Sequence, residues 1–180
     1  MSRLAPVLAV DRADHAHVTG FNRADVIVLH STESHDRPGT SDVEGILTYL
    51  EGKDYGVHYV VDGDGNIGRG AYHHQRVSHC KGANSFAIGI EMIGRAAWPM
   101  KRWSFDPDTR KARKQLAAVA KLIAHISREE SIPLRMSTTL GVACHRDFPE
   151  GGHWDPGPGF PIGWVMKRAR LYRRIYKVTR

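Results

Sequence analysis

The chain has 180 residues, of which 41% are hydrophobic and 25% are charged, and this length and composition predict one globular domain with its own core. It contains no run of 18 apolar residues, and the apolar stretch near its N-terminus is too short for a signal peptide, so we expect neither a membrane-spanning helix nor a leader. The formal net charge of +7 favours an anionic partner, although much of the excess lies in the last stretch, KRARLYRRIYKVTR.

Hydrophobic periodicity predicts alternating strands and helices. Short apolar, β-branched runs predict strands at 25–30, 57–61 and 86–94, and the Asp-Gly-rich segment 62–66 predicts a hairpin turn into a partner strand. Helical spacing predicts helices at 42–51, at 107–128 and from Trp164 onward, the first of them with a capping box that starts at Ser41. This mixture predicts an α/β fold in which helices pack on a sheet.

Two motif matches in the predicted turn fail on their context. Residues 63–68 fit G-x-G-x-x-G, but the chain that follows has no helical pattern, so a hairpin turn explains these glycines better than a dinucleotide site. The spacing from Asp62 also begins like a calcium loop, but Ile67 and His73 stand where that loop needs Gly and Glu.

Segment 143–164 gathers candidate metal ligands. His145, His153 and Asp155 lie within eleven positions, among glycines and prolines that exclude a helix or a long strand but can fix a rigid path. Such a loop could return Asp155 to His145. A catalytic zinc ion takes three protein ligands and keeps one position for water. We predict His145 and Asp155 as two ligands and His30, at the end of the first strand, as the third.

Four segments, in this order, resemble type 2 N-acetylmuramoyl-L-alanine amidases, the zinc amidases of phage lysins, bacterial wall-recycling enzymes and peptidoglycan recognition proteins. They are VIVLHSTES, GVHYVVDGDGNIGRG, VSHCKGANSFAIGIEMIG, and CHRDF followed by GHWDPGPGFPIGW. The last segment is most similar to the amidase domains of mycobacteriophage endolysins. The resemblance implies an N-terminal lead-in at 1–23 and one catalytic domain at 24–180, with a central mixed β-sheet flanked by helices and a zinc site at the sheet edge.

The resemblance also implies a zinc site. One Zn²⁺ ion is expected on His30, His145 and Asp155, with Asp155 where other members have Cys. Because carboxylate donates less charge than thiolate, this set should leave the metal a stronger Lewis acid. The cysteines are weaker candidates for ligands: Cys144 should point to the opposite face of its strand from the metal, and Cys80 only follows a groove position. Both cysteines are expected as free thiols, with a disulfide as the alternative.

Catalytic and binding residues carry over from the resemblance position by position. Glu91, in the I-G-I-E motif, is expected as the general base, with a solvent-facing strand residue as the alternative. His153 stands where many members have a Lys that stabilises the oxyanion, and an imidazole N–H can do the same. His79 matches a position that lines the substrate groove, with a purely structural role as the alternative. Val57 occupies the place of a helper Tyr, so that role is empty here.

The resemblance implies zinc-dependent hydrolysis of the amide bond between N-acetylmuramic acid and L-alanine in peptidoglycan. We expect a monomer that is made in the host cytoplasm, acts on the cell wall after release, binds peptidoglycan, and neither inserts into membranes nor binds nucleic acid. Two alternatives remain. One is a non-catalytic peptidoglycan-binding module of the same fold, and the other is a nucleic-acid binder that uses the Arg-rich last helix.

Overall fold

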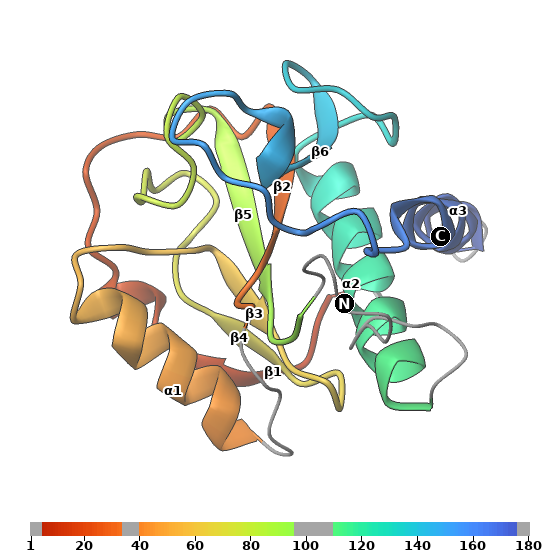
Figure 1. Ribbon diagram of the computed structural model, residues 1–180, viewed down its shortest axis with the longest axis horizontal. Coiled ribbons are helices and arrows are strands. Elements are labelled where there is room, and N and C mark those ends of the chain that lie inside the picture. The colour runs from red at the N-terminus through yellow and green to blue at the C-terminus, as the bar shows by residue number, and fades with distance from the viewer. Residues whose placement is uncertain (1–4, 34–39, 96–109, 176–180) are drawn as a thin grey trace.

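The computed structural model describes residues 5–33, 40–95 and 110–175, and these residues form one six-stranded sheet with helices on both faces (Figure 1). The elements in chain order are β1 (Leu8–Asp11), η1 (Ala13–His15), β2 (Val26–Ser31), α1 (Thr40–Glu51), β3 (Tyr59–Val61), β4 (Ile67–Arg69), β5 (Ala87–Met92), α2 (Arg110–Glu129), β6 (Gly141–Cys144), η2 (His145–Asp147) and α3 (Ile162–Ile175). The strand order is β1-β4-β3-β5-β2-β6, and every neighbouring pair is parallel except the hairpin β3–β4. The expected α/β domain with a mixed sheet is confirmed.

Most predicted elements are present, with shifted ends. Strands β2, β3 and β5 and helices α1, α2 and α3 fall on the predicted segments, while residues 107–109 of the second predicted helix lie outside the described residues. Helix α1 begins at Thr40, so Ser41 lies inside the helix rather than before it as predicted. No helix in the described part of the chain is long and apolar enough to cross a membrane.

Two strands were not predicted. Strand β1 lies in the segment that we expected as a lead-in, and it pairs in parallel with β4 at one edge of the sheet. Strand β6 has only four residues and pairs in parallel with β2 at the other edge. Their pairing with distant parts of the chain holds these short segments in place, and the sequence pattern does not show such pairing.

The predicted hairpin turn joins β3 to β4. One carboxylate oxygen of Asp62 accepts hydrogen bonds from the backbone N–H groups of Asp64 and Asn66, both at 2.9 Å, and the other accepts one from the Asn66 amide at 2.8 Å. Asp62 is fully buried and serves the turn itself. Gly63 and Gly65 therefore lie in a turn between two antiparallel strands, as predicted, and Gly68 lies in β4.

Alternation along β2 decides which side chains face the candidate site. Ile27 and Leu29 point into the main core, which α2 and α3 cover, whereas Val26 and Val28 pack in a second cluster on the opposite face. Because successive strand residues point to opposite faces, His30 shares the face of Val26 and Val28. Helix α1 packs farther along this second face (Figure 1).

Strand β5 repeats this alternation beside β2. Ile90 and Met92 enter the main core, so Glu91 points to the opposite face. In the parallel pairing of the two strands, His30 lies directly beside Glu91. The sheet therefore presents an imidazole and a carboxylate side by side on the face that carries α1.

Candidate metal centre

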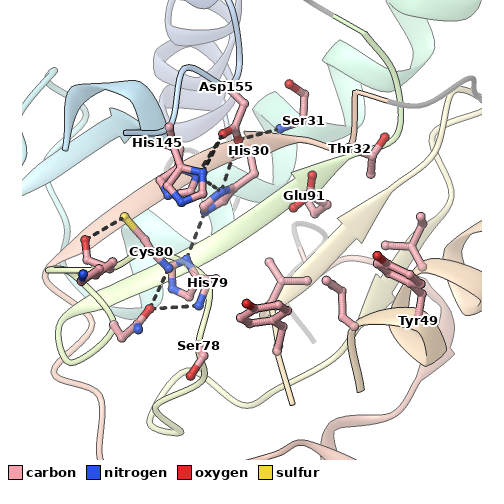
Figure 2. A pocket seen from close by; sticks show the side chains of 18 residues that line it. His30, Ser31, Thr32, Tyr49, Ser78, His79, Cys80, Glu91, His145 and Asp155 are labelled. Atoms are coloured by element: carbon pink, nitrogen blue, oxygen red, sulfur yellow. Dashed lines mark hydrogen bonds and ion pairs between the residues drawn. The ribbon is translucent and has the colours of Figure 1, made fainter. Parts of the chain in front are cut away.

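A groove of about 800 Å³ opens on the α1 face of the sheet (Figure 2). Its lining includes all six residues that the sequence singled out: His30, His79, Glu91, His145, His153 and Asp155. They come from β2, β5, η2 and two loops, segments that are far apart in the chain. The fold thus brings every predicted site residue to one cavity, while the individual role of each remains a prediction.

The three predicted metal ligands converge at one end of this groove. The two Nδ1 atoms of His30 and His145 lie 3.0 Å apart, and Asp155 places Oδ1 3.0 Å from the His145 Nδ1 and Oδ2 3.5 Å from the His30 Nδ1. Ligand atoms around tetrahedral zinc, with bonds of about 2.0–2.1 Å, lie roughly 3.3–3.4 Å apart. The spacing of the three side chains therefore fits a single small cation.

The hydrogen bonds of His79 set the protonation of His30. The His79 Nε2 lies 3.2 Å from the carbonyl oxygen of Ala87, which can only accept, so this nitrogen carries the proton. Its Nδ1 then accepts a hydrogen bond, at 3.0 Å, from the Nε2–H of His30. The lone pair of His30 consequently lies on Nδ1, which faces His145 and Asp155. This is the state in which an imidazole binds a metal, so the donor set fits zinc in chemistry as well as in spacing.

His79 lies close against the sheet. A Cβ on Gly89 would come within 2.7 Å of the His79 Nδ1, so a glycine at this position of β5 leaves the room that the ring needs. Burial, followed by the nearby His30 and His58, lowers the pKa of His79 well below its usual value. Both ring nitrogens of this neutral imidazole face protein groups, so a substrate would meet its carbon edge. The predicted substrate contact of His79 remains a prediction.

Asp155 is ionised in this setting. Burial alone would raise the pKa of its carboxyl group, but the neighbouring imidazoles of His145 and His30 outweigh burial and hold the pKa well below its usual range. The backbone N–H of Ser31 also donates to Oδ2 at 3.3 Å. A buried carboxylate is stable only with such partners, and it is the form that binds a cation.

Arg146 ties the glycine- and proline-rich loop to the turn that holds His145. Its backbone N–H donates to the carbonyl oxygen of Asp155 at 2.8 Å, and its guanidinium donates to the carbonyl oxygens of Pro156 and, at 2.5 Å, of Gly157. These contacts explain how a loop without regular structure returns Asp155 to His145. The role of Arg146 was not predicted from the sequence, because its partners are backbone carbonyls that no side-chain pattern reveals.

Glu91 lies partly buried in the groove beside His30, not on an open strand surface. Burial raises the pKa of its carboxyl group well above the usual value, and the charges of Asp155 and Glu33 raise it further. A carboxyl group whose pKa moves toward neutrality can take up and release a proton at the pH of the reaction. The environment of Glu91 thus suits proton transfer.

His153 sits at the rim of the groove. Its ring stacks on that of His145 with centroids 3.9 Å apart, and its side chain is 47% exposed. Its Nδ1 is 3.9 Å from the Oδ1 of Asp155, which is beyond hydrogen-bond range. The imidazole is therefore next to the three converging side chains with an edge open to solvent.

The wall of the groove opposite the ligands comes from α1 and the segment that follows it. Tyr49 and Tyr55 line the groove with 62% and 57% of their surface exposed, next to Ile46 and Leu50. This wall was not predicted from the sequence. A tyrosine on the outer face of an amphipathic helix was the available signal, but it is also common on a plain solvated surface.

Both cysteines are free thiols, as predicted, and both are buried. Burial raises the pKa of Cys80 and of Cys144 to about 12, so each thiol stays protonated at neutral pH. Neither belongs to the metal-ligand cluster of the described residues. Only the thiolate is a good metal ligand, which agrees with ligation by histidine and aspartate.

The groove on the sheet and the converging histidines and aspartate form a site that could hold a metal ion. The family model described as N-acetylmuramoyl-L-alanine amidase matches residues 10–158, and the chain belongs to this family. This match confirms the family that the four sequence motifs indicated. The closer likeness to mycobacteriophage endolysins remains a prediction, and a search of curated proteins found no match.

Solved structures share the fold at low sequence identity. The amidase LysC of Clostridium intestinale URNW is 20% identical, with a TM-score of 0.59 and coverage of 86% of this chain and 91% of its own. The endolysin of Thermus scotoductus bacteriophage Ph2119 is 14% identical, with a TM-score of 0.64 and coverage of 89% and 97%. The Apis mellifera protein PGRP-SA is 19% identical, with a TM-score of 0.63 and coverage of 86% and 92%. At these identities the likeness shows the fold.

His58 contacts β5, the strand that carries Glu91, and makes a pH-dependent contribution to stability. It is fully buried, its Nδ1 accepts the N–H of Gly89 at 3.0 Å, and its Nε2 faces the carbonyl of Gln75 at 3.1 Å. Burial, followed by the nearby His73, lowers its pKa from 6.5 to about 3. Below pH 6.5 the unfolded chain takes up a proton at this position that the folded chain refuses, so acid removes stability.

We therefore expect the difference in unfolding free energy between the native protein and a His58→Gln variant to shrink as the pH falls from 6.5 toward 3. Urea unfolding in chelator at several pH values measures this difference. The exposed His15→Gln variant is the control and should follow the native protein at every pH. A difference for His58→Gln that stays constant over this range would contradict the assignment.

Proposed function

We propose that this chain is a zinc-dependent amidase that cleaves the bond between N-acetylmuramic acid and L-alanine in peptidoglycan. The observation that carries the proposal is the convergence of His30, His145 and Asp155, with the lone pair of His30 on Nδ1, in a groove that also holds Glu91. Membership of the N-acetylmuramoyl-L-alanine amidase family supports the bond and the substrate class. The ligand set supports one zinc ion.

The residues of the groove divide the steps of amide hydrolysis. A zinc ion on the three ligands would supply a Lewis acid that polarises the scissile carbonyl and acidifies water. Glu91 takes the proton from the attacking water and later delivers it to the leaving amine of alanine. His153 donates an N–H to the oxyanion that forms on the carbonyl oxygen. His79 keeps the Nδ1 of His30 unprotonated and correctly turned.

The groove and the surface charge suit a wall polymer. The groove is large enough to bind part of a glycan strand and its peptide stem, and the tyrosines on its far wall offer flat amphipathic contact. The net charge of +7 favours approach to an anionic envelope. We propose a monomer that is made in the host cytoplasm and acts on the wall after release.

A peptidoglycan-binding module without catalysis is the alternative, and the likeness to PGRP-SA is the observation that favours it. Binding alone needs neither a metal ligand set nor a proton acceptor beside it, whereas this groove has both. Purified peptidoglycan separates the two functions. An amidase releases new N-terminal alanine amines, and chelator stops the release, whereas a binding module sediments with the wall and releases none.

Asp155→Ala should bind one zinc equivalent less per chain than the native protein. Its activity should fall by more than roughly 10²–10³-fold, which is the loss caused by removing one oxyanion donor from an enzyme. The variant removes the charged ligand of the set. Elemental analysis of the dialysed protein measures the zinc, and release of alanine amines measures the activity. Glu150→Ala, which removes an exposed carboxylate from the same loop, is the matched control and should match the native protein in both. Unchanged zinc content in Asp155→Ala would remove Asp155 from the ligand set.

Glu91→Gln should keep the zinc content of the native protein and lose about 10²–10⁴-fold in kcat, the usual contribution of a general base. The amide keeps the shape of the side chain but cannot take a proton. Zinc analysis and turnover on purified peptidoglycan are measured on the same sample. Near-native turnover would show that another group moves the proton.

His153→Ala should lower kcat about 10²-fold and leave KM nearly unchanged, because it removes a donor that acts on the oxyanion and not on the bound substrate. His153→Lys restores a donor at this position and should recover most of the rate. If both variants lose the same activity, or if only KM changes, His153 is not the oxyanion donor.

A further inference from the structure

A second cluster of metal-binding side chains lies on the other face of the sheet. His73, in the loop after β4, places its Nδ1 2.6 Å from the Oε1 of Glu130 and 4.0 Å from the Oε2 of Glu129. One ligand atom from each of these three residues lies within 4.8 Å of the other two. The cluster joins the loop at 70–76 to the end of α2, two parts of the chain that are more than fifty residues apart.

His125 extends the cluster along α2. It precedes Glu129 by one helical turn, and its Nε2 lies 3.2 Å from the Oε2 of Glu129. Side chains four residues apart on a helix share a face, which is a common way to hold a metal from two sides. The close group of ligand atoms offers one imidazole and two carboxylates, and His125 adds a second imidazole beside Glu129. A donor set that includes imidazole suits Zn²⁺ and not Mg²⁺, which prefers oxygen ligands.

Burial at the cluster is graded. The side chains of His73 and His125 are 13% and 10% exposed, whereas those of Glu130 and Glu129 are 30% and 51% exposed. The four residues line a cavity of about 410 Å³. The imidazoles are therefore held by the fold, and the open side has room for a water ligand.

Tyr59 orients His73 from the protein side. Its hydroxyl lies 2.8 Å from the Nε2 of His73 and it is 4% exposed. Burial raises the pKa of Tyr59, so the phenol stays neutral. When the Nε2–H donates to this hydroxyl, the lone pair on Nδ1 faces the two carboxylates. Metal-binding histidines commonly have such an oxygen partner on their other nitrogen.

Electrostatics at the cluster favour a cation. Glu129 is the last residue of α2 and Glu130 follows it directly, and the helix dipole is itself negative at this end. Arg69 also lines the cavity, but its guanidinium makes two hydrogen bonds to the carboxylate of Asp11.

We propose that His73, Glu129 and Glu130, with His125 beside Glu129, form a second zinc site, separate from the amidase groove. Tyr59 packs in the core under α2, so the cluster lies across the sheet from His30 and Glu91. The bound ion crosslinks the loop at 70–76 to the end of α2. Its role is to stabilise the fold, and the cleavage reaction does not use it.

The test uses the full chain in an Asp155→Ala background, which disables the groove site. Calorimetric titration with ZnCl₂ should show one more zinc equivalent in Asp155→Ala than in Asp155→Ala with Glu129→Gln or with His73→Ala. His74→Ala in the same background removes the neighbouring histidine of the loop and should keep the equivalent. The same titration with MgCl₂ should give no binding at this site. Zinc should also raise the Tm of Asp155→Ala and leave that of the two double variants unchanged.

Glu129→Gln alone should keep native amidase activity while losing one zinc equivalent. Because the side chain of Glu129 is half-exposed, this variant is expected to fold even if His73→Ala does not, and circular dichroism checks both. Equal zinc stoichiometry in Asp155→Ala and in its Glu129→Gln double variant would overturn the second site. A zinc-induced rise in Tm that survives Glu129→Gln would also overturn it.

Discussion

Parallel pairing of β2 with both β5 and β6 is the constraint on which the groove depends. Because the three strands are parallel, their carboxyl ends lie side by side, which brings His30, Glu91 and the turn that carries His145 together. A slip of one residue in β2 would turn His30 into the main core and bring Leu29 to the groove. The buried Val, Ile and Leu side chains of β2 oppose that slip, because each is fully buried in its present register. The hydrophobic core thus sets the position of the ligands.

Polar contacts complete what the strand register begins. One ring nitrogen of His79 faces the carbonyl oxygen of Ala87, and the other faces His30. One ring nitrogen of His58 faces the carbonyl oxygen of Gln75, and the other accepts the N–H of Gly89. Arg146 holds the loop that carries Asp155 through hydrogen bonds to its backbone carbonyl oxygens. Buried imidazoles and a buried carboxylate are costly without partners, so these hydrogen bonds stabilise the fold and fix the direction of each ligand atom together.

The residues of the groove could be predicted from the sequence more completely than the strands of the sheet. The β-branched run of β2 and the Asp-Gly turn predict local structure because their signals are local, and the ordered motifs identify the residues of the groove. Strands β1 and β6 are four residues each and depend on partners far along the chain, so no short window reveals them. Arg146 was missed because it contacts backbone carbonyls. The bond between His79 and His30 was missed because it joins residues 49 positions apart.

The two clusters contain the same kinds of side chain, and their surroundings separate their roles. In the groove, His30 and His145 are nearly fully buried and a further carboxylate, Glu91, stands beside the ligands with its pKa raised by burial. The proposed hydrolysis uses that pairing, because it needs a metal position and a proton acceptor in one cavity. At the end of α2, both carboxylates belong to the cluster itself, and the group that contacts His73 from the protein side is a neutral tyrosine, Tyr59. A cation bound there would hold the loop at 70–76 to the end of α2, which is the stabilising role that we propose for it.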